Sequence, residues 1–145
     1  MTATLDAETR ADLLKRAQAV RLNAHAPYSN FFVGAAILAD DGSIHVGANV
    51  ENASYPEGWC AETSALGQMI AAGKPGEGRR VAAVFVVADR VDGGIVCTPC
   101  GGCRQRLKEF SHPQTLIHCS DPAGKGQDFT MAELLPAGFS LEERL

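Results

Sequence analysis

Two groups of residues in this chain have the types and the spacing needed to bind a metal ion. Cys97, Cys100 and Cys103 lie in the run C-T-P-C-G-G-C, and Cys60 lies well upstream in C-A-E, two residues before Glu62. A C-x-x-C pair at the start of a helix places both thiols on one face, where they can hold one metal ion. The pair alone is equally typical of a redox dithiol or of two buried thiols without chemistry.

Cys60 favours the metal over these two interpretations. Like the C-x-x-C pair, it opens a predicted helix, and the partial positive charge at helix N-termini favours the thiolate form that binds metals. Three thiolates from Cys60, Cys100 and Cys103 would leave one position of a zinc ion open. A closed structural site is the alternative, with Cys97, Cys119 or a histidine as the fourth ligand.

Glu62 distinguishes a catalytic zinc site from a structural one. Because Cys60 and Glu62 project in different directions from a helix, Glu62 is not expected to be a further ligand on that face. At the first turn, however, both residues can flank an ion above the helix end. A carboxylate there can take a proton from an activated water and pass it to a leaving nitrogen. The alternative is a glutamate that only stabilises the helix N-terminus.

The elements that must position these residues alternate between helices and strands. The residue patterns predict helices at 5–22, 60–72 and about 98–110, with Thr98 as the N-cap, and strands at 31–39, 44–50, 81–88 and 115–119. An edge strand near Phe129 and a short helix at 131–135 follow. This order predicts an α/β fold, a three-layer α/β/α sandwich with a mixed central sheet of about five strands. Both cysteine motifs then follow strand ends, where such sheets bind ligands.

Composition limits the class of protein and the class of partner. The 145 residues are 46% hydrophobic and 21% charged, which predicts one globular domain over residues 1–145 and excludes a disordered, collagenous or coiled-coil chain. A net charge of −4 argues against a nucleic-acid partner and favours a small molecule. The charged first twenty residues and the lack of a long apolar run predict a cytoplasmic protein without a membrane partner. The odd number of cysteines argues against a disulfide framework.

Five motifs in a fixed order resemble the cytidine deaminase family and cover nearly the whole chain. They are A-P-Y-S-N-F (26–31), V-E-N-A-S-Y (50–55), C-A-E (60–62), P-C-G-G-C-R-Q (99–105) and E-L-L-P (133–136). The resemblance implies a zinc-dependent cytidine aminohydrolase of pyrimidine salvage with one Zn²⁺ per chain. Such an enzyme converts cytidine and 2'-deoxycytidine to uridine and 2'-deoxyuridine and releases ammonia, by a mechanism already described for zinc deaminases.

The resemblance carries the family's catalytic residues onto four positions of this chain. Cys60, Cys100 and Cys103 match the three zinc ligands, and a water molecule takes the fourth position. Glu62 matches the glutamate that shuttles protons to N3 of the base and then to the departing amine. None of the four histidines stands where the family places a zinc ligand.

The substrate-binding residues follow in the same way. Asn49 and Glu51 match the residues that hold the ribose hydroxyls, the backbone of Ala61 faces the polar edge of the base, and Phe31 packs on the base. Phe139, beyond E-L-L-P, matches an aromatic residue that a neighbouring subunit supplies in the homotetramers of the short family members. As alternatives, Asn49 and Glu51 are turn residues, and Phe31 and Phe139 are ordinary packing residues.

One position departs from the family pattern. Many members with three cysteine ligands have an arginine directly after the catalytic glutamate, where this chain has Thr63. Three thiolates on Zn²⁺ sum to a charge of −1, so another group must offset this charge. The candidates are helix N-terminal amides, the Thr63 hydroxyl, and Arg104 beside Cys103.

Two other functions compete with nucleoside deamination. A related zinc deaminase could act on another cytosine-bearing small molecule, such as blasticidin S, or on a polynucleotide. The negative net charge argues against the polynucleotide, and Asn49 with Glu51 favours a ribose-bearing substrate. A non-catalytic zinc module would require a fourth protein ligand and would leave Glu62 without a role.

Overall fold

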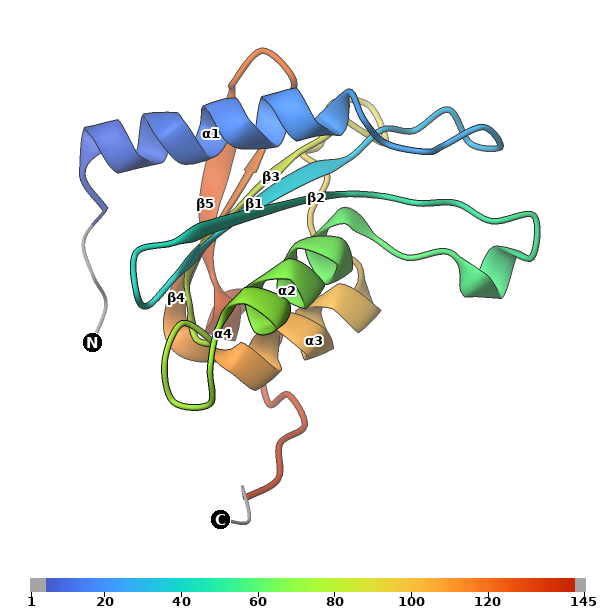
Figure 1. Cartoon of the computed structure of the whole chain (residues 1–145). Coiled ribbons are helices and arrows are strands. Elements are labelled where there is room, and N and C mark those ends of the chain that lie inside the picture. Colours follow the sequence, from blue (N-terminus) through green and yellow to red (C-terminus); the bar gives the residue numbers. More distant parts are fainter. Residues whose placement is uncertain (1–4, 143–145) are drawn as a thin grey trace.

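The computed structural model describes residues 5–142 and contains the predicted alternation of helices and strands (Figure 1). In chain order the elements are α1 (Ala7–Arg21), β1 (Gly34–Ala39), β2 (Ile44–Ala48), the short 3-10 helix η1 (Tyr55–Glu57), α2 (Ala61–Ala72), β3 (Val81–Val87), α3 (Gly101–Phe110), β4 (Ser111–Ser120), β5 (Gly126–Thr130) and α4 (Met131–Leu134). Within residues 5–142, no helix has the length and apolar character needed to cross a membrane.

The strands form one mixed sheet in the order β2-β1-β3-β4-β5. β1 pairs antiparallel with both β2 and β3, β3 pairs parallel with β4, and β4 pairs antiparallel with β5. The predicted central position of the apolar strand at 81–88 is confirmed. The strand consists of valine, alanine and phenylalanine, which is the composition expected where helices cover both faces of a sheet.

The sheet separates two cores, which confirms the three-layer arrangement. α1 covers one face, and α2, α3 and α4 lie on the other (Figure 1). Alternate residues of each strand enter opposite cores: Ile37 and Val84 face α2 and α3, whereas Ala36 and Phe85 face α1 and pack near Leu13.

Two glycines allow the helices to lie close to the sheet. A Cβ atom at Gly47 in β2 would lie 2.4 Å from the backbone nitrogen of Ala65 in α2. A Cβ atom at Gly34 in β1 would lie 2.1 Å from the carbonyl oxygen of Ala17 in α1. Any larger residue would force one helix away from the sheet. At Gly47 the displaced helix would be α2, whose N-cap is Cys60.

Several predicted boundaries were wrong. The strand predicted at 31–39 begins at Gly34, and the strand predicted at 44–50 ends at Ala48. The third helix begins at Gly101 with Cys100 as its N-cap, and not with Thr98 as the cap. The Thr98 hydroxyl instead accepts a 2.8 Å hydrogen bond from Arg104, whose guanidinium also holds the carbonyl of Pro99. β4 is also longer than the predicted 115–119, because pairing with β3 begins at Ser111 despite an irregularity in register.

Candidate active site

The two cysteine motifs meet because two helices begin at the same edge of the sheet. β2 and β3 both run antiparallel to β1, so their carboxyl ends point the same way. α2 follows β2 and α3 follows β3 in the chain. Cys60 is the N-cap of α2 and Cys100 is the N-cap of α3, and Cys103 is the third residue of α3. The first turns of two helices therefore surround one point.

The sulfur positions fit a zinc ion. The Sγ atoms of Cys60 and Cys100 lie 3.7 Å apart, and the three Sγ atoms of Cys60, Cys100 and Cys103 lie within 4.8 Å of one another. Tetrahedral zinc with bonds of about 2.3 Å requires sulfur atoms roughly 3.8 Å apart. All five cysteines are free thiols in the structure. Cys60, Cys100 and Cys103 would therefore hold one zinc ion as a three-cysteine site.

The part of the chain that the structure describes offers no fourth protein ligand. Among residues 5–142, no other cysteine and no histidine, aspartate or glutamate joins the cluster. Cys119 is fully buried in β4, and burial raises the pKa of its thiol to about 12. Burial also raises the pKa of Cys97, which lines the neighbouring cavity. Three protein ligands are the number found in catalytic zinc sites, whereas structural zinc sites have four.

Glu62 is a buried carboxylate beside the cysteines. It is the second residue of α2, and only 3% of its surface is exposed. Burial raises the pKa of Glu62 above its ordinary value. The hydrogen bond between the Cys60 and Cys103 thiols, followed by burial and the charge of Glu62, raises the pKa of Cys103. A metal that binds here must therefore displace protons, as thiolate ligation requires.

A cavity of about 550 Å³ opens beside this cluster. We call its two sides the cysteine end, formed by Cys60, Ala61, Glu62 and Cys100, with Cys103 buried behind them, and the loop end, formed by Tyr28, Ser29, Phe31, Asn49, Glu51 and Tyr55. Seven predicted site residues line it: Phe31, Asn49, Glu51, Cys60, Ala61, Glu62 and Cys100. The volume is that of a small-molecule site.

Glu51 ties the loop end together. Its carboxylate accepts hydrogen bonds from the backbone nitrogens of Tyr28 (3.0 Å) and Ser29 (3.1 Å), and from the Ser29 hydroxyl. These bonds, with the Ser29 hydroxyl first, lower the pKa of Glu51 below its ordinary value. Glu51 is therefore an ionised acceptor at the cavity wall. Ser29 was not among the predicted site residues, although it lies within the A-P-Y-S-N-F motif.

Asn49 already makes two structural hydrogen bonds. Its Oδ1 accepts from the backbone nitrogen of Val33, and its Nδ2 donates to the carbonyl oxygen of Phe31, both at 2.9 Å. Each amide atom can make one more hydrogen bond, and Asn49 lines the cavity. Asn49 thus fixes the segment that carries Phe31 and still has capacity to contact a ligand.

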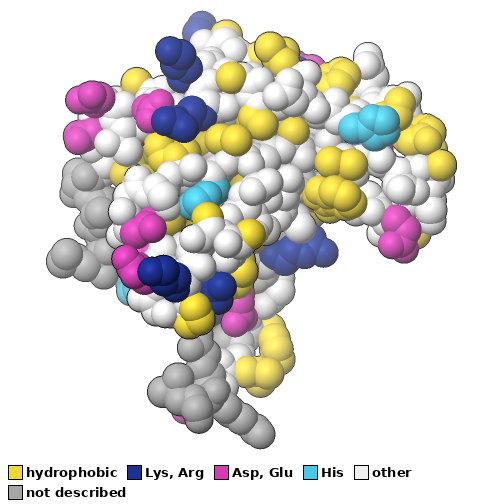
Figure 2. Space-filling model, in the orientation of Figure 1, with side chains coloured by type: hydrophobic (Ala, Val, Ile, Leu, Met, Phe, Trp, Pro, Cys, Tyr) yellow, Lys and Arg dark blue, Asp and Glu magenta, His cyan; other side chains and the backbone are white. Residues whose placement is uncertain are grey.

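Aromatic side chains are exposed at the loop end and at Trp59, which also lines the cavity. Tyr28, Tyr55 and Trp59 are 52%, 75% and 48% exposed, and the rings of Tyr28 and Tyr55 lie 5.8 Å apart. Figure 2 shows hydrophobic side chains at the surface of this part of the molecule. Phe139 is 68% exposed and does not line the cavity of its own chain, and its carbonyl accepts a hydrogen bond from Gln105.

The two residues proposed to offset thiolate charge lie in different environments. The Thr63 hydroxyl lies 3.5 Å from the Sγ atom of Cys103. Arg104 points elsewhere: its guanidinium donates to the carbonyl oxygens of Pro99 and Leu134, both at 2.7 Å, and to Thr98. Arg104 therefore connects the turn before α3 to α4. Arg106 donates a hydrogen bond to the Thr63 hydroxyl. It was not among the predicted site residues, although it follows Cys103 by about one helical turn.

Comparisons with known proteins agree with this geometry. A family model described as the cytidine and deoxycytidylate deaminase zinc-binding region matches residues 7–119. A cytidine deaminase from Halalkalibacterium halodurans is 42% identical over 134 residues, covering 92% of this chain and 96% of the relative. The crystal structure of cytidine deaminase from Burkholderia pseudomallei has a TM-score of 0.80 at 41% identity, covering 90% of this chain and 99% of that one. The crystal structure of cytidine deaminase from Mycobacterium tuberculosis has a TM-score of 0.75 at 36% identity, covering 95% of this chain and 100% of that one.

Proposed function

The chain belongs to the cytidine deaminase family, and we propose that it hydrolyses cytidine and 2'-deoxycytidine to uridine and 2'-deoxyuridine. Water adds its oxygen to C4 of the base, and the 4-amino group leaves as ammonia. The observation that carries this proposal is a buried carboxylate, Glu62, beside three cysteines that fit one zinc ion with an open position.

Glu62 is the residue that moves protons in this proposal. Zinc held by Cys60, Cys100 and Cys103 would supply Lewis-acid activation of a water molecule. The Glu62 carboxylate takes one proton from the attacking water and delivers it to N3 of the base. It then carries the other proton of the same water to the departing amine, which leaves as ammonia. Its burial keeps bulk water away from the proton that it carries. The backbone of Ala61 faces the polar edge of the base.

Glu51, Asn49 and Phe31 hold the nucleoside at the loop end. The ionised carboxylate of Glu51 accepts hydrogen bonds from sugar hydroxyls, and the Asn49 amide uses its remaining hydrogen-bonding capacity in the same place. Phe31 packs against the base. All three residues line the same cavity as Glu62, which supports one ligand that spans both ends.

The test is a comparison of substrates. Ammonia release by the purified zinc-loaded chain is measured with cytidine, 2'-deoxycytidine, cytosine and blasticidin S. We expect both nucleosides to be turned over and free cytosine to be a poor substrate, because it lacks the sugar. Higher kcat/KM for blasticidin S than for cytidine would establish the alternative substrate class, and no ammonia from any of the four would contradict the proposal.

We also propose that the chain forms homotetramers in which Phe139 enters a neighbouring subunit's cavity. The exposed Phe139 and the exposed aromatic residues Tyr28 and Tyr55 support this arrangement, because such side chains are commonly covered in assemblies. Sedimentation equilibrium is expected to give four chains. Mixing inactive Glu62→Gln chains with Phe139→Ala chains is expected to restore activity, because some hybrid sites contain both native residues. A fully active monomer would contradict the proposal.

The proposed setting is pyrimidine salvage in the cytoplasm. The free thiols support it, because a reducing compartment keeps cysteines available as metal ligands. Fractionation of cells that express the chain, with assay of cytidine deamination in each fraction, tests the location. Activity confined to an exported fraction would contradict it.

A further inference from the structure

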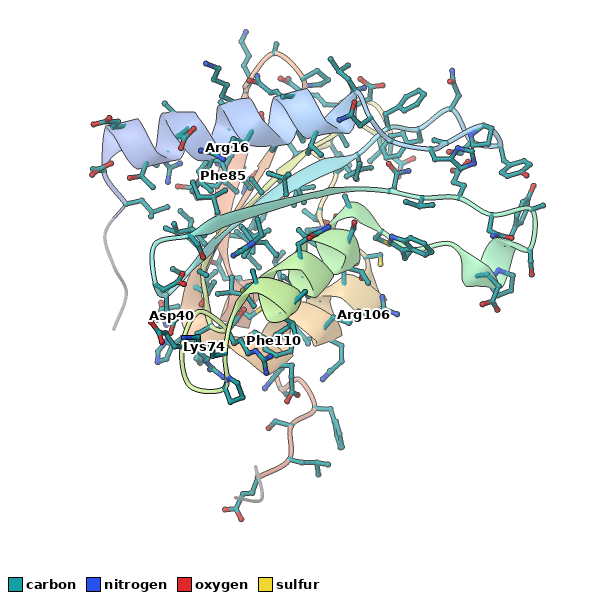
Figure 3. All side chains as sticks on the ribbon, viewed as in Figure 1. Arg16, Asp40, Lys74, Phe85, Arg106 and Phe110 are labelled. Carbon is teal, nitrogen blue, oxygen red and sulfur yellow. The ribbon has the colours of Figure 1, made fainter. Side chains whose placement is uncertain are left out.

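A chain of polar contacts leads from the zinc site to an exposed arginine. The Thr63 hydroxyl oxygen lies 3.5 Å from the Sγ atom of Cys103, and Nη1 of Arg106 lies 3.2 Å from the same oxygen. Thr63 and Cys103 are each the third residue of their helices, α2 and α3, so the first turns of the two helices face one another here. Figure 3 shows Arg106 projecting from α3.

The donor properties of these groups fix the direction of the contacts. A guanidinium can only donate, so Thr63 Oγ1 accepts from Arg106. When Cys103 binds zinc as a thiolate it carries no proton, so the Thr63 hydroxyl must donate to Cys103 Sγ. The arginine therefore polarises a hydroxyl that donates to a ligand sulfur. Hydrogen bonds that chain in this way strengthen one another.

Arg106 lies on the side of α3 that also carries a second ligand. A Cβ atom at Gly102 would lie 3.3 Å from Nη1 of Arg106 and 4.0 Å from the Sγ atom of Cys100. The guanidinium thus lies beside Gly102, between Cys100 and Cys103 in the chain. No ion pair links Arg106 to a carboxylate within residues 5–142, so its charge is not neutralised by one there.

We infer that Arg106, acting through the Thr63 hydroxyl, is the cation that offsets the negative charge of the zinc thiolates. Three thiolates give zinc a net charge of −1, whereas the metal-free thiols are neutral, so a nearby cation stabilises the loaded site over the empty one. Arg106 is a positioning and charge-balancing residue, since it touches neither the reacting atoms nor zinc. Arg104 cannot take this role through the same contact, because its guanidinium is directed at two carbonyls and Thr98.

Zinc affinity, measured by competition with a chromophoric chelator, tests the inference. Thr63→Val is expected to weaken apparent zinc binding by roughly 10- to 100-fold, which is the usual range for a partner of a metal ligand, and Arg106→Gln by about 10-fold. Arg106→Lys keeps the charge and is expected to restore part of the loss. Lys108→Gln removes the same charge from the last turn of α3 and serves as the matched control, with unchanged affinity.

The double variant separates a relay from two independent effects. If Arg106 acts through Thr63, Arg106→Gln has little further effect in the Thr63→Val background, so the two losses of zinc affinity do not add.

Replacing zinc by Co²⁺ gives a second readout, since the thiolate-to-cobalt absorption bands are expected to shift in Thr63→Val and Arg106→Gln but not in Lys108→Gln. Salt should weaken zinc binding to the parent more than to Arg106→Gln, because the exposed guanidinium is screened.

This inference rests on the zinc site of the proposed function, and the outcomes distinguish the two. A parent chain that binds no zinc would contradict the site itself. A parent that binds zinc, together with an Arg106→Gln variant of equal affinity and an identical cobalt spectrum, would overturn the role of Arg106 alone. Additive losses in the double variant would overturn the relay through Thr63.

Discussion

The cysteine end of the cavity is built on the first turns of two helices, whereas the loop end is built on connecting segments. Cys60 and Cys100 are helix N-caps, and Glu62 and Cys103 are buried one turn or less beyond them. At the loop end, Tyr28, Tyr55 and neighbouring residues are exposed. Helices packed on a sheet hold their side chains within narrow positional limits. The zinc ligands and the proton-transfer residue of the proposed mechanism, which need such limits, lie at the cysteine end.

At the loop end, side-chain hydrogen bonds hold the connecting segments in place. Glu51 holds Tyr28 and Ser29, and Asn49 holds Phe31 and Val33. The same polar groups that we assign to the sugar therefore also fix the backbone of the cavity wall. This difference predicts that substitutions at the cysteine end act on the metal and on kcat, and that substitutions at the loop end act on KM and on local stability.

The largest effect is expected from loss of a ligand at the cysteine end. Cys103→Ala, combined with Cys97→Ala to prevent a neighbouring thiol from substituting, should reduce zinc content to nearly zero and abolish turnover, because two thiolates do not hold a catalytic zinc. Metal analysis of the purified chain measures this. The control is Cys97→Ala alone, which should keep one zinc per chain. Full zinc content in the double variant would remove Cys103 from the ligand set.

Glu62→Gln should separate chemistry from metal binding at the same end. The amide has the shape of the carboxylate but cannot carry protons, so kcat should fall by roughly 10²- to 10⁴-fold while zinc content and the melting temperature stay close to the parent. Steady-state kinetics and metal analysis on one preparation measure both. Near-native kcat would show that another group moves the protons.

At the loop end, Glu51→Ala should raise KM for cytidine more than it lowers kcat. A hydrogen bond to a charged group is stronger than one between neutral groups, so its loss should raise KM by roughly 10- to 100-fold. Glu57→Ala, which removes the same charge from the exposed η1, is the control and should leave KM unchanged. An unchanged ratio of kcat/KM for cytidine over cytosine in Glu51→Ala would contradict a sugar-binding role.

The smallest effect concerns pH. The folded-state pKa of Glu51 lies below its ordinary value of 4.5, so its hydrogen bonds stabilise the fold fully above pH 4.5, and this contribution is lost as pH falls through the lowered folded value. The melting temperature of the parent should therefore exceed that of Glu51→Gln near neutral pH, and the gap should close below pH 4.5. A gap that stays constant to lower pH would show that the Glu51 charge does not hold Tyr28 and Ser29.

The sequence was sufficient for the layers of the fold and for much of the candidate site. Helical spacing marked Leu13 and Ala17 as buried, and the unbroken apolar run at Val81–Val87 indicated a strand covered on both sides. These features are local, because the period of the hydrophobic pattern reports the element that buries it. The sulfur geometry supports the ligand set implied by the cysteine motifs. The roles of Glu62, Glu51 and Phe139 stay predictions.

Only the tertiary structure decided which groups bond to which. The sequence placed Arg104 beside Cys103, but its guanidinium bonds to Leu134, thirty residues away, and to the turn that sets the start of α3. Arg106 contacts Thr63 only because α2 and α3 begin at one sheet edge. Such contacts depend on how separate elements are oriented, and periodicity along one element carries no information about the side chains that a distant element presents.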